Sequence, residues 1–152
     1  MAGKAYCGVC GNTDSECPSQ TYCKNVIVRT YKAGSTIPVT INFSGNHGGV
    51  IQFRLCSAAN GAATWACLEQ HRLAIQEAGG KTIWQEPWSD NEKHDGDVPL
   101  HVTLPSGFKC DRCVFQWHWT AANYMGTCAN GTTGMGCGGQ QTYIACADIK
   151  IE

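Results

Sequence analysis

Apolar and polar residues alternate along several short stretches of this chain, which is the pattern of strands that bury one face. The clearest example runs from Ile37 to Phe43, where every second side chain is apolar. Five more stretches with alternating or β-branched residues complete the set: 26–31, 51–55, 98–104, 115–120 and 143–151. These half-buried strands, separated by turn residues, predict an all-β fold. We expect a two-sheet antiparallel sandwich of the immunoglobulin or fibronectin-III type, with long loops and several disulfides.

The same alternation assigns side chains to the two faces of each strand. Trp117 and Trp119 fall on the inward face, so we expect core residues rather than a platform for stacking sugars. His118 points the other way, as a surface or hydrogen-bonded histidine rather than a metal ligand. Gln52 and Arg54 likewise lie opposite to their apolar neighbours, on the outward face of their strand.

Residues 57–97 break the rhythm of alternation, and this stretch is too long for an ordinary loop. Its apolar residues predict a short helix from Leu68 to Ala78, ended by Gly79-Gly80. The following region, from Trp84 to Asp90, is rich in tryptophan and proline. We expect it to form a packed excursion from the sandwich.

Length and charge narrow the classes of partner. The chain has 152 residues, enough for one domain over residues 1–152 with a sizeable core. Its formal net charge is −1, and it has no basic run. Nucleic-acid binding needs clustered lysine and arginine, so we expect no nucleic-acid partner. No apolar run approaches the ~20 residues of a membrane span, so we expect no membrane association.

Cysteine is the strongest compositional signal, with 11 residues in the chain. Such a number is typical of an oxidising compartment, where disulfides persist. Cys128 and Cys137 flank a glycine-rich loop and are expected to bridge each other, and Cys56 and Cys67 can do likewise. The remaining connectivity stays open. Because the number is odd, one cysteine lacks an intrachain partner.

Two Cys-x-x-Cys pairs offer a rival interpretation. Cys7 with Cys10 and Cys110 with Cys113 have the spacing of a tetrahedral zinc site. A zinc site would leave the other cysteines unexplained, so we favour disulfides throughout.

The cysteines predict a secreted, extracellular protein. Two glycosylation sequons, at Asn42 and Asn130, fit such a surface, and the alternation turns Asn42 toward solvent. The first residues of the chain nonetheless lack the apolar core of a signal peptide. We therefore expect that upstream sequence has been lost, and that it would carry the signal and a further cysteine.

One histidine stands in a loop that favours exposure. Asn46-His47-Gly48-Gly49 separates two predicted strands, and such loops often carry metal ligands and binding residues. A distant Gln141-Thr142-Tyr143 leads into the last strand. On the residues alone, His47 can equally be an ordinary exposed histidine, and Tyr143 a core tyrosine at a strand start.

Further groups of residues form a recognisable series along the chain: 7–11, 31–34, 46–49, 53–56, 110–117, 136–140 and 145–149. Together they resemble the chitin-binding type-4 domain, and most closely the animal-type lytic polysaccharide monooxygenases. The likeness spans nearly the whole chain in the right order. It implies a domain that binds insoluble polysaccharide, chitin or cellulose, on a flat face around one copper ion. Such proteins cleave the polymer oxidatively with an external electron donor and peroxide or oxygen.

The resemblance also implies roles for individual residues. In the family a histidine at the N-terminus chelates copper through its ring and its amine, and a second histidine, matching His47, completes the brace. Three nitrogens of this kind suit both oxidation states of copper. Tyr143 matches the axial aromatic residue, and Gln141 the polar residue that steers bound oxygen species, so both are assigned to catalysis. Asn46 is expected to contact the polysaccharide together with His47. Because the sequence begins with Met1, the brace is incomplete and should hold copper weakly or not at all.

Three hypotheses follow. The first is a secreted, monomeric polysaccharide-binding domain, truncated at its N-terminus and inactive as written because the copper-ligand histidine is absent. The second is a fragment of an active copper-dependent polysaccharide monooxygenase. The third is a non-catalytic structural or interaction protein, of a matrix or a virion, that uses the same sandwich. Copper affinity and activity separate the first two, and binding to insoluble polysaccharide separates both from the third.

Overall fold

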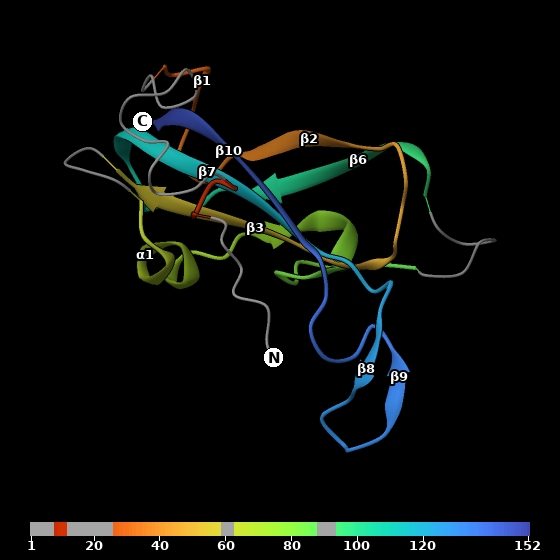
Figure 1. The fold of residues 1–152 in the computed structure, drawn as a ribbon. Helices are drawn as coiled ribbons and strands as arrows, with labels where there is room; N and C mark the ends of the chain where they lie inside the picture. The colour runs from red at the N-terminus through yellow and green to blue at the C-terminus, as the bar shows by residue number, and fades with distance from the viewer. Residues whose placement is uncertain (1–7, 12–25, 59–62, 88–93) are drawn as a thin grey trace.

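The chain folds into two facing β-sheets with a small hairpin at one end (Figure 1). The computed structural model describes residues 8–11, 26–58, 63–87 and 94–152. In chain order these residues form β1 (Arg29–Tyr31), β2 (Thr36–Phe43), β3 (Gly49–Ser57), α1 (Trp65–Gln70), β4 (Ala74–Ile75), the 3₁₀ turn η2 (Gln76–Ala78), β5 (Trp84–Glu86), β6 (Gly96–Thr103), β7 (Cys110–Thr120), β8 (Met125–Thr127), β9 (Thr133–Met135) and β10 (Thr142–Ile151).

The larger sheet has the strand order β1-β10-β7-β3-β5, and the smaller one has the order β2-β6-β4. Strands β8 and β9 form a separate hairpin. All pairs are antiparallel except β1 with β10, which run parallel. The predicted sandwich is therefore confirmed, with one correction. The first strand is shorter than predicted and joins the edge beside the C-terminal strand in parallel.

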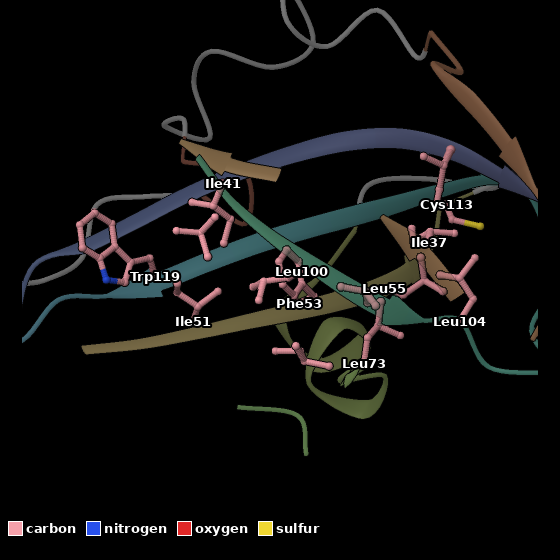
Figure 2. Close-up of a cluster of buried hydrophobic side chains, with 14 of the residues drawn as sticks. Ile37, Ile41, Ile51, Phe53, Leu55, Leu73, Leu100, Leu104, Cys113 and Trp119 are labelled. Atoms are coloured by element: carbon pink, nitrogen blue, oxygen red, sulfur yellow. The ribbon is translucent and has the colours of Figure 1, made fainter. Parts of the chain in front are cut away.

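The core lies between the two sheets, as the alternation predicts (Figure 2). Ile51, Phe53 and Leu55 of β3 are fully buried and face residues of β2 and β6 such as Ile37 and Leu100. Each large apolar side chain buried in this way contributes roughly 1.5–3 kcal/mol. Trp119 lies at one end of this core and Cys113 at the opposite end (Figure 2). The inward assignment of Trp119 is confirmed, and Trp117 packs against the same core.

The outward face of β3 is buried as well, which the alternation did not predict. Arg54 is 3% exposed, and it donates hydrogen bonds to Gln116 Oε1 (3.1 Å) and Gln52 Oε1 (2.8 Å). Its Nε also lies 2.9 Å from a carboxylate oxygen of Glu69 on α1. Because α1 packs on this side of the sheet (Figure 1), the polar side chains of β3 meet one another rather than water.

The predicted helix from Leu68 to Ala78 is wrong in its extent. The helix begins after Thr64, whose hydroxyl accepts a hydrogen bond from the Cys67 amide (3.2 Å), and it ends at Gln70. The chain then extends, and Leu73 and Ile75 enter the core, with Ile75 pairing to β6. The predicted stop is also wrong for the helix, since Gly79 instead ends the short turn η2, in the left-handed conformation that favours glycine.

Four disulfides lie among the described residues: Cys10–Cys146, Cys56–Cys67, Cys110–Cys113 and Cys128–Cys137. The two predicted pairs are confirmed. The zinc hypothesis is wrong, because Cys10 is bonded to Cys146 and Cys110 to Cys113. Cys7 lies outside the described residues.

Within the region predicted as an excursion, Trp84–Glu86 form a strand of the larger sheet. Strand β5 extends the edge of β3, and Trp84 packs against the core. Trp88 and Asp90 lie outside the described residues. Asn42 is exposed as predicted, and it donates a hydrogen bond to Asp97 (2.7 Å). Within the described ranges, neither helical segment has the length and apolar character that a membrane crossing requires.

Candidate functional site

The loop between β2 and β3 carries His47 at one end of the sandwich. Gly48 and Gly49 both have positive φ (62° and 101°), so the chain turns sharply there. A Cβ on Gly49 would lie 2.1 Å from the carbonyl oxygen of Thr120, so only glycine lets β3 begin this close to β7. The carbonyl of His47 accepts a hydrogen bond from the Ala122 amide (3.1 Å). The loop backbone is therefore held against the end of β7.

Trp119 joins the two residues that the sequence singled out. The His47 ring stacks on Trp119 with centroids 6.1 Å apart, and the Tyr143 ring stacks on it at 4.7 Å. The indole Nε1 donates to the Gly48 carbonyl (2.8 Å), and Phe43 meets the ring edge-on at 5.0 Å. This gathering follows from register, because Tyr143 of β10 pairs with Trp119 of β7. We predicted Trp119 only as core, since no sequence signal pairs these strands.

Tyr143 is 37% exposed, so it is not a core tyrosine. Its hydroxyl donates a hydrogen bond to Gln141 Oε1 (3.2 Å), and Asn123 Nδ2 donates to the same oxygen (3.1 Å). Gln141 itself is exposed. Two donors thus orient its amide beside the Tyr143 ring. Sequence analysis did not identify Asn123, which lies in the loop after β7.

Asn46 is next to His47 in the chain but faces the interior. Its side chain is 6% exposed. Its Oδ1 accepts from the Gly48 amide (2.9 Å), and its Nδ2 donates to Glu86 (2.7 Å) and to the His94 carbonyl. The structure therefore brings together His47, Gln141 and Tyr143, and it places the Asn46 side chain behind them.

The other histidines are engaged elsewhere. His71 meets Phe108 edge-on, His94 contacts Glu86, and His101 contacts Glu77. His118 is half-buried against Trp65 rather than on the surface, with ring centroids 5.9 Å apart. Its Nδ1 is buried without a hydrogen-bond partner among the described residues. Burial, and then the nearby Arg54 charge, lower the pKa of His118 from 6.5 to about 4.

The hairpin β8–β9 rises from the same end of the sheet, after β7 and before β10 (Figure 1). Met125 and Met135 face each other across the hairpin and are both exposed. The Gln140 side chain fixes the base of the hairpin, because it accepts from the Tyr124 amide (3.0 Å) and donates to the Tyr124 and Cys137 carbonyls. The exposed Met125 and Met135 are thus carried by a hairpin that is braced at its base.

Comparison with known proteins identifies the class. A family profile described as "Lytic polysaccharide mono-oxygenase, cellulose-degrading" matches residues 2–149, and the chain therefore belongs to this family. Among solved structures, the chain is similar to the lytic polysaccharide monooxygenase AA15 from Thermobia domestica in the Cu(I) state. The two share 38% sequence identity with a TM-score of 0.83, over 95% of this chain and 76% of that chain. No curated protein matches.

Membership in the family implies dependence on copper, so the described residues can be tested for a copper site. His47 offers one imidazole and Tyr143 one phenol, and both rings stack on Trp119. In the described ranges no cluster of three or more His, Cys, Asp or Glu side chains can hold a metal ion. All five histidines of the sequence fall within these ranges. The described residues therefore fit part of a copper site and do not complete one.

Proposed function

We propose that this chain is a polysaccharide-binding domain that attaches to insoluble chitin or cellulose through the surface around His47, Gln141 and Tyr143. The observation that supports this most directly is that His47 and Tyr143 both stack on Trp119 at an accessible end of the sandwich. Family membership independently supports an insoluble polysaccharide as the substrate class. The match over residues 2–149 also supports a single domain over the chain.

The chemistry of this surface suits a sugar polymer. The apolar faces of pyranose rings stack on aromatic rings, and Tyr143 and Tyr124 are both exposed. The exposed amide of Gln141 can exchange hydrogen bonds with sugar hydroxyls, since an amide both donates and accepts. Met125 and Met135 would widen the apolar area along the hairpin. We revise the role of Asn46, because its buried side chain supports the loop from within.

Copper supplies the redox chemistry of the family when it is bound. Of this chain's own residues, His47 would ligate the ion, Tyr143 would restrict access to it, and Gln141 would offer a hydrogen-bonding amide. A single imidazole without a chelating partner holds copper weakly. We therefore propose that these 152 residues bind polysaccharide but do not oxidise it.

A second candidate is favoured by one specific observation. Gln141 is oriented by Tyr143 and Asn123 at the site itself, an arrangement that plain adhesion does not require. In this alternative the chain is a fragment of an active copper monooxygenase whose second histidine lies outside these 152 residues.

The setting and the oligomeric state are also proposals. Four disulfides among the described residues support an oxidising, extracellular compartment. The exposed Asn42 and Asn130 are open to glycosylation there. We propose a monomer in which the exposed Tyr124, Met125, Met135 and Tyr143 stay free to meet the polymer.

Sedimentation with insoluble chitin and with cellulose tests the proposal. We expect weak, reversible binding to at least one polymer, with no oxidised oligosaccharides in the presence of ascorbate and peroxide. His47→Ala should lower binding modestly and leave folding intact, since a residue in a glycine-flanked loop contributes little to the core. The half-buried His47 contrasts with His101, which is exposed away from this surface, so His101→Ala is the control and should bind like the parent. Oxidised products that vanish in His47→Ala would establish the enzyme instead. A protein that ignores every insoluble polysaccharide would leave the structural or interaction hypothesis.

A further inference from the structure

A buried carboxylate lies directly behind the loop that carries His47. Glu86 ends β5, pairs in register with Gly49, and is 2% exposed. Its Oε1 accepts hydrogen bonds from Asn46 Nδ2 (2.7 Å), the His94 amide (2.9 Å) and His94 Nδ1 (2.9 Å). Its Oε2 accepts from Trp84 Nε1 (3.0 Å). These four donors match the roughly four acceptor positions of an ionised carboxylate.

The charge state of this group follows from its surroundings. Burial raises the pKa of Glu86, but the hydrogen bonds from the His94 amide, Trp84, the His94 ring and Asn46 outweigh burial and lower it below the ordinary value. Glu86 is therefore an acceptor at neutral pH. Every donor around it requires an acceptor there, since a buried N–H without a partner is costly.

Asn46 connects this carboxylate to the loop. Its Nδ2 donates to Glu86, and its Oδ1 accepts from the Gly48 amide (2.9 Å), two residues along the chain. Through these two bonds the Asn46 side chain ties the peptide group after His47 to Glu86. On the opposite side, Ala122 and Trp119 donate to the carbonyls of His47 and Gly48. The His47 backbone is thus clamped between the Glu86 network and the end of β7.

We infer that Glu86 is a positioning residue for His47, acting through Asn46 to fix the direction in which the imidazole leaves the loop. The inference rests on the proposed function only in taking His47 as the residue that meets the ligand. Glu86 touches neither the imidazole nor the exposed surface, and its effect passes through one side chain.

The fold contains a matched control for this arrangement. Glu77 accepts hydrogen bonds from the amide (2.8 Å) and the Nδ1 (2.6 Å) of His101, the same pair of contacts that Glu86 makes with His94. Glu77 is exposed and belongs to η2, and it makes these contacts on β6. Glu77→Gln therefore repeats the chemical change of Glu86→Gln without the link to Asn46.

Amide hydrogen exchange and histidine NMR of the full chain test the inference. In Glu86→Gln the new amide N–H₂ meets donors, and Asn46→Ala removes the link itself. We expect both variants to speed exchange of the Gly48 and Ala122 amides at least tenfold, with the Val102 amide of the core unchanged. We also expect the His47 ring protons to shift, because they lie over Trp119 and sense any tilt through its ring current. Glu77→Gln should alter the His101 amide and leave Gly48, Ala122 and His47 as in the parent.

The double variant separates positioning from general destabilisation. If Glu86 acts through Asn46, Glu86→Gln adds no further change at Gly48 or His47 once Asn46 is alanine. Additive effects, or an unchanged Gly48 amide in Asn46→Ala, would overturn the inference. If Glu86→Gln does not fold, Glu86→Asp, whose shorter side chain withdraws the carboxylate from Asn46, replaces it in the same comparison. Sedimentation with chitin and cellulose is run in parallel. If the parent does not bind either polymer, the proposed function is wrong. The exchange pattern tests the inference about Glu86 independently of that result.

Discussion

The Tyr143 ring lies flat against Trp119, with centroids 4.7 Å apart and planes 24° from parallel. Tyr143 is 37% exposed and Trp119 only 5%, so the pair joins the surface of the sandwich to its core. The position of Tyr143 is therefore set by the register of β10 on β7 rather than by a loop. A side chain placed in this way keeps its orientation without help from a ligand.

Replacing Tyr143 separates the stacking from the hydroxyl. Tyr143→Ala should lower the free energy of unfolding for two reasons, the loss of buried apolar area and the loss of the ring stack. The stack should account for about 0.5–1.5 kcal/mol, the usual range for an aromatic pair. Tyr143→Phe keeps the stack and loses an exposed hydrogen bond, so its free energy of unfolding should stay within about 0.5 kcal/mol of the parent. Urea denaturation measures both. Equal losses in the two variants would show that the hydroxyl, and not the ring, carries the stability.

His118 makes the stability of the protein depend on pH. Its pKa is lowered from 6.5 to about 4 in the fold. Between these two pH values the imidazole is therefore protonated in the unfolded chain and neutral in the folded chain. The stabilising contribution is thus complete above pH 6.5 and is lost as the pH falls from 6.5 to about 4. We expect a loss of about 1–2 kcal/mol, less than the full shift implies, because the imidazole keeps some solvent contact.

The difference between the parent and His118→Gln isolates this effect. The carboxylates Glu69, Glu77 and Glu86 have lowered pKa values, so their contributions are lost only below about pH 4.5, and they are common to both proteins. The free energy of unfolding is followed by denaturation between pH 7 and pH 4.5, and the parent should lose more of it than His118→Gln as the pH falls. Parallel curves would show that His118 has the same pKa in the folded and the unfolded chain.

Copper affinity tests the incomplete ligand set. We expect the chain as given to bind Cu(II) no more tightly than about micromolar, because a lone imidazole lacks the pre-organised chelate on which brace affinity depends. Titration calorimetry measures the affinity, and His47→Ala should abolish it. A nanomolar affinity would mean that further ligands exist, and His94→Ala would be the first variant to examine.

Counting thiols tests the disulfides. All eight cysteines within the described ranges are paired, which leaves Cys7, Cys17 and Cys23 of the sequence. Three is odd, so at least one of them has no intrachain partner. Alkylation of the unfolded, unreduced monomer should label an odd number of cysteines, all from this group. If a monomeric chain carried the label on Cys128 or Cys137 instead, the assignment of the hairpin disulfide would be wrong.

Much of the fold can be predicted from alternation, because a strand with one buried face repeats every two residues. The prediction fails where a second layer covers the outer face. Arg54 and Gln52 look solvent-facing in sequence, and only α1 explains their burial. The same cover explains why His118 is half-buried rather than on the surface. The apolar spacing of Leu68, Leu73 and Ile75 suits a helix as well as an extended segment, so the helix was drawn too long.

The site was predicted in part. His47 stood out because glycines flank it, and Tyr143 and Gln141 were assigned through the family resemblance. Trp119 could not be predicted as their common support, because its role depends on which strands are neighbours. Glu86 was missed for a similar reason. It is an isolated acidic residue in sequence, and its importance comes from the four hydrogen bonds that Asn46, Trp84 and His94 donate to it in the fold.

The disulfide between Cys10 and Cys146 gives the domain a particular mechanical behaviour. It joins residues that are 136 positions apart in the sequence. A force applied ahead of Cys10 and at Glu152 is therefore transmitted through the disulfide, and the residues between the two cysteines do not carry it. The part of the described chain under load is then residues 147–152, of which Ile149 to Ile151 lie between β1 and β7. Because those strands run along the direction of the pull, they resist it in shear. His47, Trp119 and Tyr143 all lie off this load path, so tension on the ends of a domain attached to a solid polymer would leave the attachment surface unstrained.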